Sequence, residues 1–195
     1  MNTLQAQRLD RFGILALVMV ATRLGHIGSH LSLPDASWAV FFLAGFYLTR
    51  QWLWAFPLLM AEAAAIDFAA IGFFGVSNYC VTRAYWFLVP AYAALWCGGR
   101  WFRQRYTFGA GSLVPLLASL FVSVSVCYLI TNGSFYWLSG RLAHPDFAGW
   151  VGNFRLWYLP FLRVPFIYVG VAAVLHVLAV QLGRLSGKTA AGARR

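Results

Sequence analysis

Long apolar segments separated by short polar stretches make up almost the whole chain, and this pattern limits the fold more than any motif does. Of the 195 residues, 61% are hydrophobic and 10% are charged. An α-helix needs about 20 apolar residues to cross the hydrocarbon core of a bilayer. A water-soluble domain of this size does not have such a composition. We therefore predict an all-α integral membrane protein, with residues 1–195 forming a single membrane domain.

The apolar segments predict six transmembrane helices. Their ranges are about 11–29, 36–51, 53–73, 84–102, 111–131 and 158–183. The longest polar stretch is 132–157, and residues 184–195 form a basic tail. Residues 1–11 lead into the first apolar segment without a small-residue cleavage site, so we expect that segment to remain as a helix.

The distribution of basic residues orients these helices. Most of them fall at the two termini, near position 50 and in the turn 99–107: Arg8, Arg11, Arg50, Arg100, Arg103, Arg105, Arg184, Lys188, Arg194 and Arg195. The positive-inside rule places this side, with both termini, in the cytoplasm. The net charge of +10 is therefore attributed to topology, because no basic face is clustered for nucleic acid. The chain has no phosphate-binding loop, so we expect no nucleotide site and no ATP hydrolysis.

Cys80 is the strongest candidate for chemistry. It lies in the polar connection "FGVSNYCVTR", which the predicted topology places on the outward, oxidising side. Arg83 follows three residues later, and a nearby cation favours the thiolate, which is both a nucleophile and a soft metal ligand. Cys97 and Cys127 lie in apolar segments and are interpreted as packing residues. The alternative for Cys80 is a disulfide with Cys127, if both lie near the outer surface.

Asp67 lies in "AAAIDFAAIG", inside a predicted membrane helix, where an unpaired carboxylate costs several kcal/mol. It therefore needs a partner, and the candidates are Arg83, the hydroxyl of Tyr85 and Arg23. Such a pair either fixes the packing of the helices or serves a ligand. Glu62 lies five residues earlier and points about 140° away, so the two carboxylates are not expected to act as a pair.

Histidines offer weaker signals. His26 and His30 are four residues apart near the outer end of the first helix, a spacing that suits two metal ligands, with Cys80 as a further donor. No third ligand follows at a regular spacing. His176 lies among Val and Leu in the last helix and is expected to be a structural histidine with satisfied hydrogen bonds.

The last outer stretch, "ITNGSFYWLSGRLAHPDFAGWVGNFRLWY" from Ile130 to Tyr158, combines aromatic rings with amides. Such a lining suits a large, flat ligand that carries amide groups. The alternative for each ring is the aromatic belt of the membrane interface.

The layout as a whole resembles the substrate-binding S-components of energy-coupling-factor (ECF) vitamin transporters. Within that group, "IDFAAIGFFGVSNYCVTRAYWF" resembles the BtuM family of cobalamin (vitamin B12) transporters, with Asp67, Cys80 and Tyr85 in the order of the family. The resemblance implies an S-component-like bundle and a corrinoid substrate. It also implies that Cys80 is an axial ligand of the cobalt and that Asp67 and Tyr85 support that site.

One departure concerns the energy source. S-components that dock on an ATP-driven ECF module carry an A-x-x-x-A pattern on helix 1, which lets a partner helix approach closely. Here "GILALVMVATRLG" has Ala16 followed four residues later by Val20. The sequence therefore leaves two possibilities, a transporter that docks on an ECF module in an atypical way and a solitary transporter.

A thiolate against the face of a corrin ring can displace the upper axial ligand of cobalt. We therefore expect Cys80 to assist removal of cyanide from cyanocobalamin during uptake across the bacterial inner membrane. From their position beside Cys80 or in the outer stretch, further residues are expected at the corrinoid: Asn78, Tyr79, Arg83, Trp86, Asn132, Phe135, Tyr136, Trp137 and Asn153.

Two other functions remain open. One is a binding-only S-component, whose transport needs an ATP-driven ECF module. The other is a membrane thiol oxidoreductase, against which the absence of a C-x-x-C motif counts.

Overall fold

The described part of the chain folds into six α-helices, which agrees with the predicted number of helices. The computed structural model describes residues 3–23 and 33–192, and it contains no strand in them. The helices are α1 (Thr3–Arg23), α2 (Ser37–Tyr47), α3 (Trp52–Phe74), α4 (Leu88–Arg105), α5 (Leu113–Leu138) and α6 (Phe147–Gly192). Short 3-10 helices lie in the connections: η2 (Thr49–Gln51), η3 (Asn78–Cys80), η4 (Arg83–Phe87) and η5 (Ala110–Ser112).

Three helical segments among the described residues are long and apolar enough to cross a membrane. They are Thr49–Phe74, Ala110–Leu138 and Phe147–Arg184, and the apolar helix α2 is shorter. These segments are compatible with a membrane protein. The six-span topology with cytoplasmic termini stays a prediction.

The prediction that residues 132–157 form a long polar loop is wrong. Helix α5 continues to Leu138 and α6 already begins at Phe147, so only residues 139–146 lie between them. Polar and aromatic side chains do not end a helix, because the backbone hydrogen bonds are satisfied within it. The helices end where the chain supplies end signals. Gly140 adopts φ +69 just after α5, and the Asp146 carboxylate accepts a hydrogen bond from Gly149 N at 2.6 Å at the start of α6.

Other boundaries shift less. Helix α3 agrees with its predicted range within one residue, whereas α1 begins eight residues before the predicted position 11. Its predicted end at position 29 lies outside the described residues. The segment 36–51 is divided at Leu48 into α2 and η2, and the start of the segment 84–102 is the 3-10 helix η4.

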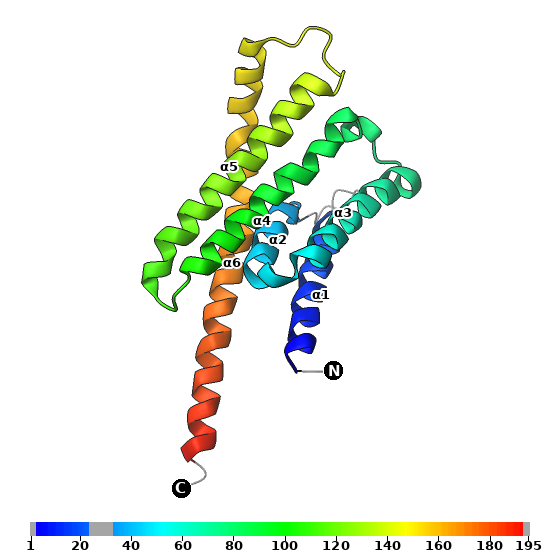
Figure 1. The fold of residues 1–195 in the computed structure, drawn as a ribbon. Coiled ribbons are helices and arrows are strands. Elements are labelled where there is room, and N and C mark those ends of the chain that lie inside the picture. Colours follow the sequence, from blue (N-terminus) through cyan, green and yellow to red (C-terminus); the bar gives the residue numbers. More distant parts are fainter. Residues whose placement is uncertain (1–2, 24–32, 193–195) are drawn as a thin grey trace.

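Helix α2 forms the centre of the core. Its side chains Phe41, Phe42 and Ala44 are fully buried, and Figure 1 shows it lying between α1, α4 and α6. The backbones of α2 and α4 approach so closely that a Cβ atom on Gly45 or Gly99 would overlap a main-chain carbonyl of the other helix. Glycine at these two positions is therefore a requirement of the packing.

The two ends of the bundle differ in what they carry. In Figure 1 both termini and the turn between α4 and α5 lie toward the lower end, while the α3–α4 and α5–α6 connections lie at the opposite end. Helix α6 has 46 residues and is about 69 Å long at 1.5 Å per residue, well beyond the roughly 30 Å of a bilayer core. Its C-terminal part extends past the other helices.

Candidate functional site

A buried arginine joins four helices at the end of the core that carries the connection between α3 and α4. Arg23, the last residue of α1, has a side chain that is only 9% exposed. Its Nε and NH2 groups donate to the two carboxylate oxygens of Asp67 in α3, each at 2.6 Å. Its NH1 group donates to Ser37 Oγ at 2.8 Å, to Tyr92 OH at 3.3 Å and to Asp35 Oδ2 at 3.4 Å. This bidentate geometry is that of a strong, charge-assisted pair.

Tyr85 extends the same network to η4. Its hydroxyl donates to Asp67 Oδ2 at 2.9 Å, so Asp67 accepts three hydrogen bonds from two side chains. Of the three partners that the sequence suggested for Asp67, Arg23 and Tyr85 are present. Arg83 is exposed and makes no ion pair with Asp67 in the described structure, so that candidate is wrong.

The segment that contains Cys80 also contacts the connection between α5 and α6. The 3-10 helix η3 begins at Asn78, whose carbonyl accepts a hydrogen bond from the Arg141 guanidinium at 3.4 Å. The same guanidinium lies 5.0 Å from the ring centroid of Tyr79, and that ring is 5.5 Å from the ring of Phe135. The backbone of Cys80 ends η3, and its side chain is outside the described part of the structure.

The other predicted wall residues lie on helices, not in loops. Phe135, Tyr136 and Trp137 belong to α5, and Asn153 belongs to α6. Trp86 in η4 is 79% exposed. Within the described residues no hydrogen bond or ring contact joins Trp86, Tyr136, Trp137 or Asn153 to η3, so only Phe135 of the predicted α5 wall reaches that segment.

Two buried polar atoms between α5 and α6 lack a partner among the described residues. They are Asn132 Oδ1 and the indole Nε1 of Trp150. The amide nitrogen of Asn132 donates to Tyr128 OH at 3.2 Å, which leaves the carbonyl oxygen as a spare acceptor. Asn132 is one of the residues that the sequence analysis expects at the corrinoid.

Sequence reasoning missed four members of these contacts: Asp35, Ser37, Tyr92 and Arg141. A usable signal existed for Asp35, because an aspartate just before an apolar helix is typical of a helix start. Its Oδ1 accepts hydrogen bonds from Ser37 N at 2.9 Å and from Ser37 Oγ at 2.6 Å. Tyr92 carries no such signal, because its role depends on how α4 packs against α1.

Cys127 and His176 follow the structural interpretation, whereas Cys97 is free and exposed on α4 and is not buried in the core. Cys127 is a free, fully buried thiol in the core, so the structure does not contain the alternative disulfide with Cys80. Both ring nitrogens of His176 are hydrogen-bonded, to Tyr47 OH at 3.0 Å and to Tyr106 OH at 2.9 Å, which confirms the prediction of a structural histidine. Within residues 3–23 and 33–192 no three His, Cys, Asp or Glu residues form a metal-binding group. His26 and His30 lie outside that range.

This geometry limits what Asp67 can do chemically. A carboxylate held by a guanidinium and a phenol is not a free general base, since both of its oxygens already accept strong hydrogen bonds. Through the hydroxyl of Tyr85 it contacts η4, which follows the Cys80 segment closely in the chain.

A scan against models of protein families and a search of curated proteins both find no match for this chain.

Proposed function

We propose that this chain is a cobalamin transporter of the bacterial inner membrane, similar to the BtuM family. It crosses the membrane six times with both termini in the cytoplasm, and it binds a corrinoid at the outward end with Cys80 as the axial ligand of cobalt. The observation that carries the proposal is the 2.9 Å hydrogen bond between Tyr85 and Asp67. These two residues are the ones that the resemblance associates with Cys80.

The contacts on both sides of Cys80 support a preorganised thiol. After it in the chain, Tyr85 is bound to Asp67, which is itself paired with the buried Arg23. Before it, Asn78 accepts from Arg141 of the α5–α6 connection. A segment held at both ends loses little conformational entropy when a ligand binds, and a thiolate fixed near the metal acts at a high effective concentration.

The proposed chemistry is a ligand exchange. The thiolate sulfur of Cys80 donates an electron pair to cobalt(III) while the bond from cobalt to cyanide breaks, and cyanide leaves with its own electron pair. Cobalt keeps its oxidation state in this step. In a later reduction, an external thiolate attacks the Cys80 sulfur and forms a disulfide with it, and the electron pair of the broken cobalt–sulfur bond stays on the cobalt. Sulfur is a soft donor, so it competes for cobalt where a hydroxyl does not.

A Cys80→Ser variant tests this assignment. Serine has nearly the same size, but its hydroxyl stays protonated and is a poor ligand for cobalt. We expect the variant to insert and fold normally, to lose the visible spectral change of thiolate ligation and to release no cyanide from cyanocobalamin. Cys97→Ala and Cys127→Ala are matched controls that should keep both properties. Full cyanide release by the serine variant would contradict the assignment.

Transport itself is tested separately. Because helix 1 lacks the A-x-x-x-A pattern, we expect cobalamin uptake in cells where this chain is the only transporter component. Uptake that appears only when an ECF module is added would instead support the binding-only S-component.

A further inference from the structure

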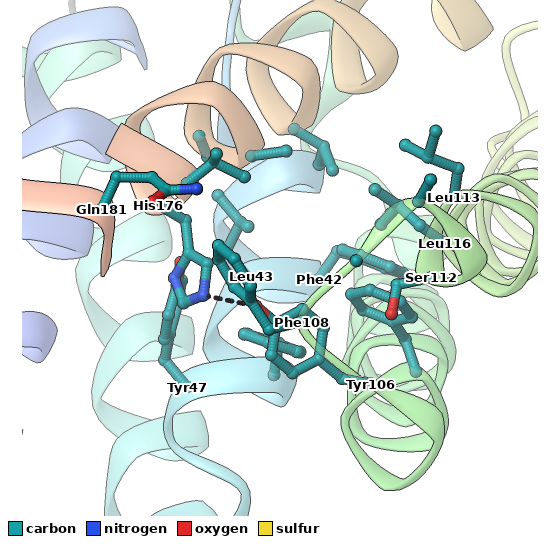
Figure 2. Close-up of a pocket in the computed structure, with 18 residues that line it drawn as sticks. Phe42, Leu43, Tyr47, Tyr106, Phe108, Ser112, Leu113, Leu116, His176 and Gln181 are labelled. Atoms are coloured by element: carbon teal, nitrogen blue, oxygen red, sulfur yellow. Dashed lines mark hydrogen bonds between the residues drawn. The ribbon is translucent and has the colours of Figure 1, made fainter. Parts of the chain in front are cut away.

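A cavity of about 330 Å³ lies at the end of the bundle opposite the Cys80 segment. It is partly open, and its lining comes from α2, the end of α4 and the following turn, η5, the first turns of α5 and the later part of α6. Figure 2 shows His176 and Gln181 of α6 facing Leu43 and Tyr47 of α2, with Phe108 of the turn close by. Its volume is at the lower end of the range for small-molecule pockets, about 300–1,000 Å³.

The walls of this cavity are mostly apolar, and most of the polar side chains in them are hydrogen-bonded to the protein. Phe42, Phe46, Leu116 and Val169 line it together with other hydrophobic side chains. Its histidine, His176, has both ring nitrogens committed to tyrosine hydroxyls. The Ser112 hydroxyl in the wall donates to the carbonyl of Thr107. Apart from the Gln181 amide, the surface offered to an occupant is therefore hydrocarbon and aromatic ring, which suits an alkyl chain.

Three guanidinium groups surround the cavity, each placed over an aromatic ring that lines it. Arg103 lies 5.4 Å from the ring centroid of Phe46, Arg184 lies 4.2 Å from that of Phe108, and Arg11 lies 5.6 Å from that of Tyr47. All three are exposed. Within the described residues the ion pairs are those of Arg23, so these three cations have no carboxylate partner there.

We propose that this cavity, with its three arginines, is a binding site for an anionic phospholipid. One acyl chain occupies the apolar cavity, and the phosphate lies among Arg11, Arg103 and Arg184. The end of the bundle is the one that the charge distribution assigns to the cytoplasm, where anionic lipids attract basic side chains. The chain's own C-terminal tail is an unsuitable occupant, because Lys188, Arg194 and Arg195 would be repelled by the same cations.

This inference is independent of the corrinoid proposal, since it concerns the opposite end of the molecule. Lipid bound here would contact α2, α6 and the α4–α5 turn at once, and so would fix the long C-terminal part of α6 against the bundle. The protein would then depend on the lipid composition of the membrane for its stability.

Native mass spectrometry of the purified full-length chain in detergent tests the site. The probes are phosphatidylglycerol and phosphatidylcholine with identical acyl chains. Each basic side chain near an anionic surface strengthens attraction about fivefold, so we expect phosphatidylglycerol to bind at least about fivefold more strongly. The double variant Arg103→Gln, Arg184→Gln should lose this preference. Arg105→Gln is the matched control, because Arg105 lies 3.9 Å from the ring of Trp101, which does not line the cavity.

A second variant tests the acyl chain separately from the headgroup. Ala173→Phe fills the cavity and leaves the arginines in place, so we expect it to bind neither lipid with one-to-one stoichiometry. Thermal unfolding of each variant checks that it is folded. If Ala173→Phe does not fold, the lipid preference of the arginine variant alone decides the proposal. Equal binding of both lipids, unchanged binding in the arginine variant, or a lipid-free dimer that covers the cavity would each overturn the proposal.

Discussion

Replacing Asp67 with asparagine tests whether the arginine network holds α1 and α3 together. The change removes the charge that pairs with Arg23 and leaves one amide oxygen for three donors. Breaking a fully buried ion pair costs about 3–5 kcal/mol. Asp67 is 25% exposed and Asp35 remains 3.4 Å from the guanidinium, so we expect a smaller loss of about 2–3 kcal/mol.

The assay is thermal unfolding of the purified variant in detergent. For a chain of this length, the loss corresponds to a melting temperature that is roughly 5–10 °C lower. Glu62→Gln is the matched control, because it makes the same chemical change in the same helix, at a carboxylate without a hydrogen bond or ion pair in the described structure. We expect that variant to remain within about 0.5 kcal/mol of the parent. Equal melting temperatures for the two variants would refute the reasoning.

Two further variants, Arg23→Gln and Tyr85→Phe, separate a structural role of Asp67 from a ligand role. If Asp67 only positions η4, then Arg23→Gln should reduce corrinoid binding as much as Asp67→Asn does, because both changes break one pair. Tyr85→Phe should couple to Asp67→Asn by about 0.5–3 kcal/mol in a double-mutant cycle. A larger loss of binding for Asp67→Asn alone would assign it a direct contact with the ligand.

Two further predictions concern packing and topology. Gly45→Ala should destabilise the protein by about 1–3 kcal/mol in chemical denaturation, because its methyl group would overlap the carbonyl of Trp96. Gly72→Ala is the control, since its methyl group has open space, and it should be neutral or stabilising by up to about 1 kcal/mol. Equal stabilities of the two variants would contradict the close approach of α2 and α4. A membrane-impermeant thiol reagent added from outside should label Cys80 in ligand-free protein and miss Cys97, and labelling of Cys97 alone would invert the topology.

Helix number and boundaries show different limits of sequence reasoning. Six apolar segments correctly predicted the six helices of the described residues, because apolar runs of this length must satisfy their backbone hydrogen bonds internally. The boundaries of α5 and α6 were missed, since the polar and aromatic residues of 132–157 were interpreted as a loop. Hydropathy reports where a bilayer could cover the chain, and it does not report where a helix ends. The end signals at Gly140 and Asp146 were present in the sequence and were better guides.

The amino-acid pattern was enough to predict that the chain is helical and apolar, that Asp67 needs a partner inside it, and that His176 is structural. These conclusions follow from local chemistry, because a carboxylate among apolar residues is costly wherever the helices lie. The pairing of Asp67 with Arg23, and not with Arg83, joins residues 44 positions apart and follows from the packing of α1 against α3. The same holds for the cavity with its three arginines, whose walls come from segments more than 100 residues apart. Such contacts depend on which helix faces pack together, and that is set by close steric fit over the whole core, as at Gly45 and Gly99, and not by any local pattern.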